Sequence, residues 1–533
     1  MKRVLSLCLM VLLLASASAF AEGGFEKFDP PVELTAVMLL ADGIQFEEGD
    51  SIDNNIWTRG YEDDLGIKVS YLWAVPLTEY LTKLNVAIST DVLPDIIRIP
   101  ANHLRLFKQL VDTGVATDMT DIYEQYAAPF TKEMVAADNG VAFDQVTVDG
   151  RLMALPYIAG NVDPASMLWI RKDWMDNLGL EAPKTIDELV ALAKAFKEND
   201  PDGNGVDDTF GLVLEKTLWG GFGALTGFTE GFGAYYNGWV ELEDGTLGYG
   251  AIQPQMRDAL ESMAKIYADG LLDPEFSVKD SNKLAEMTTA GTAGLVYGQH
   301  WIPFWPLQST KDANPDSDWV PFPIPTVDGS PAKPMVNGSA GDVFVINSTC
   351  KNPEAVMRLY DYFFAKDCAL AGDTFDPEFH ADDTRKYNRY QYAAVSTTYP
   401  LQNYFIHQGV MKYFNENDET MLENYWVGDN IGQNQKYQAG DNTFWMTHAW
   451  SGATGAFSVI DQYVQNGQLL VNGYIKADTE TMTEKGATLE KMREEIFTKI
   501  IMGVEPIEAF DTFVVNWKNM GGDDITAEVN AAR

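Results

Sequence analysis

The sequence predicts an α/β protein with more than one lobe, and three features lead to this expectation. The chain has 533 residues, long enough for two to four lobes of ordinary domain size. Hydrophobic residues make up 46% of it, enough to bury large cores. Strand patterns alternate with helical patterns of ten or more residues, which is typical of a sheet covered by helices on both faces. Each lobe is therefore expected to be a sheet flanked by helices.

The first part of the chain shows this alternation most clearly. A strand is predicted over 32–40, a helix around 54–66 and a second strand over 67–75. The helix 78–90 then leads into a short buried strand within 94–99. This order of elements is that of successive α/β units.

A second α/β region begins near residue 154. It contains a long predicted helix over 185–199, because Pro183 and Thr185 form a helix start signal before an apolar repeat. Stretches rich in glycine, tryptophan and proline follow, and the strand and helix pattern resumes at "SAGDVFVINS". The C-terminal part is predicted to be mostly helical, with helices over 489–503 and 506–520.

The charge of the chain excludes some partners. There are 78 acidic and 38 basic residues, so the formal net charge is −40. This excess disfavours binding to nucleic acid and to anionic membranes. A solvated acidic surface explains it, and the alternative is a specific cationic partner.

The first 21 residues have the layout of a cleaved secretory signal: two basic residues, an apolar run and small residues before Glu22. No later segment reaches about 18 uninterrupted apolar residues. Cys8 follows Leu7, where lipid attachment would require a small residue. We therefore expect an exported, soluble protein without a lipid anchor.

Two cysteines, Cys350 and Cys368, remain after removal of the signal. A helix is predicted between them from Pro353, because apolar residues recur there at helical spacing. Such a helix would hold the two Cα atoms roughly 20 Å apart, beyond the reach of a disulfide. No disulfide is predicted.

The segment "NDPDGNGVDDTFG", residues 199–211, has the spacing of a calcium-binding loop. Counting from its first aspartate, oxygen donors fall at positions 1, 3, 5, 7 and 9, and Gly205 occupies position 6, where an EF-hand requires glycine. Position 12 is Gly211, so the bidentate glutamate of an EF-hand is missing. The alternative is a solvated turn after a helix. The predicted ligands of a structural Ca²⁺ are Asp200, Asp202, Asn204, the Val206 carbonyl and Asp208.

Aromatic residues gather in three clusters, within 233–239, 297–307 and 442–450. Sugar rings stack their C–H faces on tryptophan and tyrosine, while their hydroxyls need polar partners, so mixed clusters suit a carbohydrate site. The alternative is ordinary core packing. The candidate ligand-binding residues in these clusters are Tyr236, Trp239, Gln299, Trp301, Trp305, Trp445 and Trp450.

Four long stretches, 81–97, 150–212, 247–276 and 484–530, resemble the extracellular solute-binding proteins of ABC importers. The resemblance is to the large sugar-binding and oligosaccharide-binding type, which includes the alginate-oligosaccharide-binding proteins. It covers most of the chain in the order of the family. It implies a periplasmic-binding-protein fold of type II, with two lobes that are discontinuous in sequence and close over a ligand. It places lobe 1 at 22–153 and 338–398, and lobe 2 at 154–337 and 399–533.

The resemblance also implies further site residues. In the maltose-binding relatives, residues just after the strand at 94–99 reach sugar hydroxyls, and the matching positions here include Arg98, Asn102 and His103. Those relatives carry tryptophan and aspartate where this chain has Ile99 and Asn102, so a different ligand chemistry is expected. Asn161 and Asp163, in the crossing segment "AGNVDP", are also candidates. In the calcium loop, the relatives often add a glutamate where this chain has Thr209.

The resemblance implies a carbohydrate-binding component of an ABC transporter that delivers its ligand to the permease subunits in the membrane and works as a monomer. Two alternatives remain at this stage. One is a secreted glycoside hydrolase working with two carboxylates, and the other is a surface glycan-binding protein without a transport role. Catalytic signatures do not favour an enzyme, because the five histidines show no metal-ligand spacing and there is no nucleophile elbow or P-loop.

Overall fold

The computed structural model describes residues 25–532 except 26, 41–43, 139, 339, 381–386 and 477. The predicted signal peptide and Cys8 lie outside the described residues. The chain forms two compact units, each made of separated segments. Unit 1 consists of the chain up to Asn161 and of Gly338–Gln402, and unit 2 consists of Val162–Asn337 and Asn403–Arg533. The sequence placed the three crossings near 153/154, 337/338 and 398/399.

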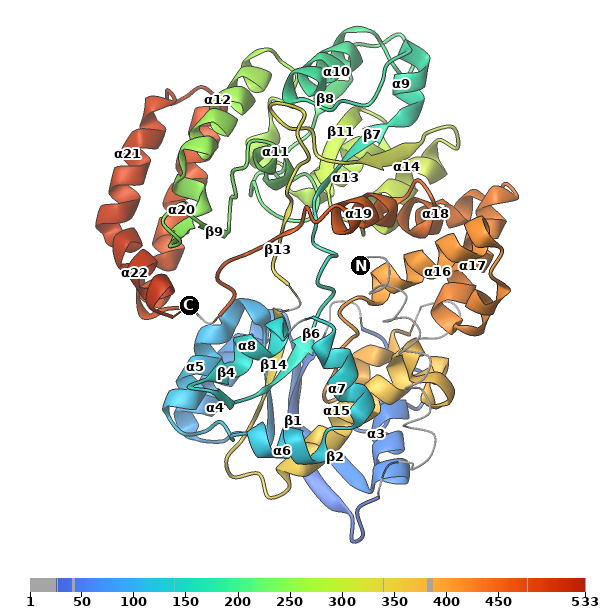
Figure 1. Ribbon diagram of the computed structural model, residues 1–533, viewed down its shortest axis with the longest axis vertical. Helices are drawn as coiled ribbons and strands as arrows, with labels where there is room; N and C mark the ends of the chain where they lie inside the picture. The colour runs from blue at the N-terminus through green and yellow to red at the C-terminus, as the bar shows by residue number, and fades with distance from the viewer. Residues whose placement is uncertain are drawn as a thin grey trace. The chain divides into compact units, whose positions relative to one another are not determined.

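Unit 1 is built around a five-stranded mixed sheet with the order β2-β1-β3-β14-β6 (Figure 1). Strand β1 runs parallel to β2 and β3, whereas β14 runs antiparallel to β3 and β6. The strand β14 enters unit 1 from a distant part of the sequence and completes the sheet. The strands are β1 Val32–Leu40, β2 Ile67–Pro76, β3 Ile96–Ile99, β6 Leu155–Ile158 and β14 Ala340–Ile346, with a hairpin of β4 Thr147–Val148 and β5 Arg151–Leu152.

The helices of unit 1 pack on this sheet and on one another. Helix α15 is buried along most of its length, and Cys350 and Cys368 flank it as free thiols. A turn of helix over Tyr61–Leu65 continues α3. The helices are α3 Ile56–Gly60, α4 Leu77–Thr90, α5 Leu104–Asp112, α6 Thr120–Tyr126, α7 Pro129–Ala136, α8 Val141–Val146 and α15 Pro353–Asp367.

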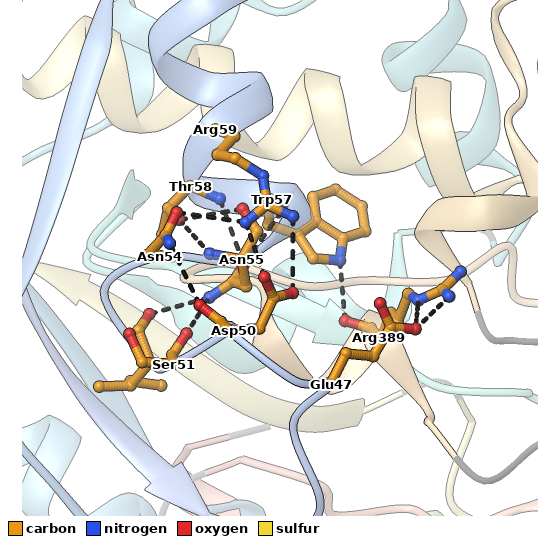
Figure 2. A network of polar contacts seen from close by, with 11 residues as sticks. Glu47, Asp50, Ser51, Asn54, Asn55, Trp57, Thr58, Arg59 and Arg389 are labelled. Carbon is orange, nitrogen blue, oxygen red and sulfur yellow. Dashed lines mark hydrogen bonds and ion pairs between the residues drawn. The ribbon is translucent and has the colours of Figure 1, made fainter.

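A polar network in unit 1 ties the start of α3 to a segment more than 300 residues later (Figure 2). Asn55 caps the helix, accepting hydrogen bonds from the backbone N–H groups of Trp57 and Thr58. The Trp57 indole Nε1 donates to the Arg389 carbonyl over 2.8 Å, and Arg389 Nε donates to a Glu47 carboxylate oxygen over 3.0 Å. The charged groups of this network are therefore used to hold two segments together.

Unit 2 contains a four-stranded sheet with the order β12-β7-β11-β8. Strands β7 and β11 are buried at every residue, which agrees with their nearly continuous apolar sequences. The strands are β7 Met167–Arg171, β8 Phe210–Leu212, β11 Ala293–Gly298 and β12 Trp319–Phe322, with two-stranded ribbons of β9 Trp239–Glu241 with β10 Leu247–Tyr249 and of β13 Met335–Val336 with β15 Leu470–Val471.

Helix α10, Ile186–Glu198, shows how sequence fixes structure in unit 2. Thr185 and Glu188 form a capping box at its start, at the position that the start signal indicated. The helix lies directly on β8, because a Cβ at Gly211 would come within 2.5 Å of the Ala193 carbonyl oxygen. This close approach requires glycine in the strand.

The remaining helices of unit 2 include a long C-terminal group. Helices α12, α20 and α21 pack side by side, with α22 against α20 (Figure 1). No helix of the described chain has the length and apolar character needed to span a membrane. The helices are α9 Lys172–Leu178, α11 Thr226–Glu230, α12 Pro254–Ala268, α13 Ser281–Thr289, α14 Gln308–Ala313, α16 Gln402–Glu416, α17 Tyr425–Gln438, α18 Trp445–Ser451, α19 Ala456–Gln465, α20 Glu480–Ile501, α21 Glu508–Trp517 and α22 Asp523–Ala531.

Both units bury a carboxyl group that prefers the neutral form. In unit 2, burial raises the pKa of Glu230 to about 8, and Glu230 Oε1 accepts a hydrogen bond from the Met335 backbone N–H over 2.9 Å. In unit 1, burial raises the pKa of Asp361 to about 7, although its carboxyl accepts hydrogen bonds from Thr131 and from the Ala128 backbone. Ionisation of either group would place a charge inside a core.

The Glu230 carboxyl makes the stability of unit 2 depend on pH. Its pKa is raised above the unfolded value of roughly 4.3, so its contribution is complete below that pH and is lost as pH rises toward 8. Glu230→Gln keeps an oxygen to accept from Met335 and cannot ionise. We expect the free energy of unfolding, measured in urea at pH 5 and pH 8, to fall less steeply with pH in the variant than in the wild-type protein. The two slopes should differ by up to about 1.4 kcal/mol per pH unit. Identical pH profiles for the two proteins would show that Glu230 does not titrate in this range.

Candidate functional site

The candidate site in unit 2 starts where the buried strand β11 ends. The chain leaves the core at Gly298 and runs through Gln299, His300 and Trp301 into a helical turn over Pro303–Leu307. Trp305 in this turn is 40% exposed. The end of a buried strand therefore places large aromatic side chains at the surface of the unit.

Trp301 lies flat against the backbone of a second segment. A Cβ at Gly221 would come within 2.4 Å of the Trp301 ring and within 2.8 Å of Gln299 Oε1. The Trp301 indole Nε1 donates to Gln299 Oε1 over 2.9 Å, and the Gln299 backbone N–H donates to the Gly221 carbonyl over 2.9 Å. These contacts fix both the position and the rotation of the Trp301 ring.

Trp301 and Trp305, which we call the tryptophan pair, have nearly parallel rings. Their centroids are 6.4 Å apart and their planes differ by 17°. The buried Phe222 supports Trp305 edge-on, with ring centroids 5.7 Å apart. An exposed, oriented indole face is what a sugar ring needs for stacking.

Asp163 supplies a polar group that is connected to the tryptophan pair. Gln299 Nε2 donates to the carbonyl of Pro164, the next residue, over 3.2 Å. Asp163 Oδ2 accepts from Asn403 Nδ2 over 2.8 Å, while the buried Asp163 Oδ1 has no hydrogen-bond partner. Burial raises the pKa of this carboxyl to about 7. A buried polar atom without a partner is uncommon and can serve a ligand.

Trp450 belongs to a neighbouring buried cluster. Its indole Nε1 donates to His300 Nδ1 over 2.9 Å, and its ring meets the half-exposed Phe304 at 5.8 Å. His300 is neutral, because its Nδ1 accepts this bond and burial lowers its pKa to about 3. Trp450 is therefore a buried residue that packs against the exposed Phe304.

Three other candidates from the aromatic clusters lie in the interior of unit 2. Tyr236 is 1% exposed and lies under the Arg493 guanidinium, Trp239 packs on Tyr249, and Trp445 donates to Asp318. These residues are packed in the interior, as the alternative of core packing describes. Sequence alone could not separate them from Trp305, because all of them lie in aromatic clusters.

Two of the four candidates in unit 1, Arg98 and Asn161, make contacts within that unit. Arg98, on β3, forms an ion pair with Asp342 on the neighbouring β14, with Nη2 2.7 Å from Asp342 Oδ2. His103 precedes α5 and is partly buried, and the side chain of Asn102 lies outside the described residues. The Asn161 backbone N–H donates to the Pro400 carbonyl, and its buried Oδ1 has no hydrogen-bond partner.

The predicted calcium loop forms a turn closed by its own hydrogen bonds. The Asn204 amide Nδ2 donates to Asp202 Oδ2 over 2.8 Å and to Asp208 Oδ1 over 3.4 Å, and the Gly205 backbone N–H donates to Asp200 Oδ2 over 2.9 Å. Burial and a contact with Asp200 raise the pKa of Asp202.

The loop has the oxygen atoms that calcium prefers, but the Asn204 amide is not oriented to bind the ion. The Asn204 amide turns its hydrogens toward two carboxylates, those of Asp202 and Asp208, where Ca²⁺ would need its oxygen. Thr209 is not a calcium ligand of the loop, because its hydroxyl Oγ1 is hydrogen-bonded to the Phe196 carbonyl over 2.8 Å. Within the described part of the chain, no group of three or more acidic, histidine or cysteine side chains is close enough to hold a metal ion.

Sequence reasoning missed three residues of the unit 2 site: Gly221, Phe222 and Asn403. Gly221 and Phe222 lie in "GGFGALTG", where the glycine content indicated only a loop. Asn403 follows the last crossing of the chain between the two units. Its position among polar residues just after that crossing was the one sequence signal that could have identified it.

Comparison with known proteins identifies relatives along most of the chain. Residues 43–367 match the model of a family described as bacterial extracellular solute-binding protein. The chain is 23% identical to Lipoprotein LipO of Bacillus subtilis, over 89% of this chain and 87% of that protein. It is 25% identical to the polygalacturonan/rhamnogalacturonan-binding protein YtcQ of the same species, over 84% of this chain and 82% of that protein.

Solved structures share the fold at lower identity. A solute-binding protein of an ABC transporter that binds HMO, from Bifidobacterium longum infantis, has a TM-score of 0.64 and 16% identity, over 95% of this chain and 99% of that one. The alginate-binding protein AlgQ2, in a structure without calcium ion, has a TM-score of 0.62 and 17% identity, over 95% and 98%. The predicted fold class, a type II periplasmic-binding-protein fold, and the resemblance that led to it are confirmed.

The contact between Gly221 and Trp301 predicts a steric effect. Gly221→Ala forces the Trp301 ring or the Gly221 backbone to move, and we expect a loss of about 1–3 kcal/mol in the free energy of unfolding, measured in urea. Gly486→Ala is the matched control. Gly486 lies inside α20 with open space around the added methyl group, so this change should stabilise by up to about 1 kcal/mol. Equal effects at the two positions would contradict the packing described.

Proposed function

Because the chain belongs to the bacterial extracellular solute-binding protein family, we propose that it is the carbohydrate-binding component of an ABC importer. The observation that carries this proposal is the tryptophan pair beside the free Asp163 Oδ1. An aromatic face for the C–H side of a sugar and a carboxyl oxygen for its hydroxyls together form a carbohydrate subsite. The names of YtcQ and AlgQ2, which describe binding to pectic polysaccharides and to alginate, support this class of ligand.

The ligand would be an oligosaccharide held by both parts of the chain. In unit 2 the proposed binding residues are Trp301, Trp305, Gln299 and Asp163, with Trp450 behind them. In unit 1 the proposed residues are Arg98, Asn102, His103 and Asn161. Closure of the two units around the ligand would create contacts present only in the closed state, and these would give the permease a signal that ligand is bound.

The proposal includes export, a monomeric state and docking on the membrane subunits of a permease. The family description as extracellular supports export. The proposal also includes a chain without a lipid anchor, unlike the relative LipO, which is named a lipoprotein. The enzyme alternative gains no support from a family of binding proteins. If the protein is instead a surface glycan-binding protein, it should bind glycans without the closure of the two units that small-angle scattering would detect.

Loss of one exposed indole should weaken binding without unfolding the protein. We expect Trp305→Ala to weaken oligosaccharide binding about tenfold or more, measured by calorimetry with the best ligand from a glycan screen. Met520→Ala is the control, because Met520 is 44% exposed, close to the 40% of Trp305, and lies in the helical turn Lys518–Gly522 that follows α21. Unchanged affinity in Trp305→Ala would remove the tryptophan pair from the site.

We also propose that the loop Asp200–Asp208 binds a structural Ca²⁺. The name of the AlgQ2 structure, which specifies that calcium ion is absent, associates this relative with calcium and supports the proposal. Binding requires the Asn204 amide to turn its oxygen inward, joining Asp200, Asp202, Asp208 and the Val206 carbonyl. Calcium would supply positive charge among three carboxylates that otherwise repel one another.

Calcium at roughly a hundred times its dissociation constant would stabilise the protein by about 2.7 kcal/mol, so EDTA should lower Tm and calcium should restore it. Asp202→Asn should abolish this response. Asp207→Asn should retain it, because Asp207 forms an ion pair with Lys197 over 2.7 Å and is not a predicted ligand. A wild-type Tm that responds to neither EDTA nor calcium would exclude the site.

A further inference from the structure

Trp219 is an exposed aromatic residue of unit 2 near the tryptophan pair. Within the described chain only four aromatic side chains are exposed: Trp219, Phe304, Trp305 and Tyr425. Trp219 is the most exposed of them, at 49%. Its indole Nε1 nevertheless donates to Glu494 Oε1 on α20 over 3.2 Å. The ring is therefore held in one orientation while much of its surface meets solvent.

The segment that carries Trp219 is fixed on the end of β11. Phe222 forms an antiparallel bridge with Gly298, the last residue of that strand. The Trp301 ring lies on Gly221, and Phe222 meets the other ring of the tryptophan pair edge-on. Trp219 precedes Gly221 by two residues, so the Cα atoms of these two residues are no more than about 7 Å apart. Trp219 therefore extends the aromatic surface from the tryptophan pair toward α20.

A strained turn brings Trp219 to the surface. Leu218, the preceding residue, has a φ of +60°, in the left-handed region that favours glycine, and its side chain is buried. The Thr217 hydroxyl donates to the Trp219 carbonyl over 3.1 Å and holds the turn. Backbone strain of this kind persists where the surrounding structure fixes it, and it is concentrated at functional sites such as ligand clamps. The turn keeps the Leu218 side chain in the core and the Trp219 side chain outside it.

We propose that Trp219 is a second stacking position for the bound oligosaccharide, beside the position that the tryptophan pair provides. This inference rests on the proposed function. A sugar ring buries one C–H face on an indole, so a chain that reaches both positions gains two such contacts. A chain too short to reach both positions gains one. The protein therefore prefers longer oligosaccharides, and the affinity rises until the chain covers Trp219.

Ladders of oligosaccharides of increasing length test the proposal. Manno-, galacto- and galacturono-oligosaccharides of one to six residues are titrated by calorimetry into the wild-type protein, Trp219→Ala and Trp305→Ala. For the longest chain that binds, we expect each substitution to weaken binding about tenfold or more. For the shortest chain that binds, only one of the two substitutions should weaken binding, because that chain occupies one position.

Two further variants separate stacking from support of the loop. Trp219→Phe keeps an aromatic face and loses the bond to Glu494, and it should retain most of the affinity that Trp219→Ala loses. Met520→Ala, the exposed control, should bind every length as the wild-type protein does. The inference is overturned if Trp219→Ala binds every length like this control, or if Trp219→Ala and Trp305→Ala weaken the binding of every length by the same factor. A wild-type protein that binds no member of the ladders contradicts the proposed function itself.

Discussion

The contact between the Trp301 ring and the bare backbone of Gly221 is the constraint on which the unit 2 site depends. It joins the end of β11 to a loop some 80 residues earlier, and it fixes the indole in one orientation. Gln299 then bonds the indole on one side and the carbonyl beside Asp163 on the other. A single close approach thus sets the distance between an aromatic face and a carboxyl oxygen, which together make a sugar subsite.

Buried carboxyl groups recur in the molecule with different consequences. Asp361 has several donors and serves packing, and Glu230 holds the strand β13 through the Met335 N–H. Glu230 and Asp163 each keep one oxygen, Oε2 and Oδ1, without a hydrogen-bond partner, but Asp163 lies next to Pro164, whose carbonyl accepts from the Gln299 that also holds Trp301. A carboxyl kept out of water is thus structural where it lies in the core, and it can serve a ligand where it lies next to exposed aromatic residues.

The sequence predicted the elements better than the site. The strand 32–40 and the start of α10 follow directly from local signals, an alternating apolar pattern and a capping box, and these signals survive folding. Local signals do not show which aromatic residues are exposed, because their burial depends on segments that are distant in the sequence. Trp239 and Trp305 both stand in glycine-rich or proline-rich sequence, yet one packs on Tyr249 and the other is exposed. Gly221 and Asn403 act through partners that only the fold brings near.

The most direct test of the central claim is a crystal structure of the protein with the oligosaccharide that binds it most tightly. Our account predicts a sugar ring stacked on Trp301 or Trp305, with one of its hydroxyls within hydrogen-bonding distance of Asp163 Oδ1. A ligand that contacts neither tryptophan, or that leaves the Asp163 oxygen without a partner, would contradict it.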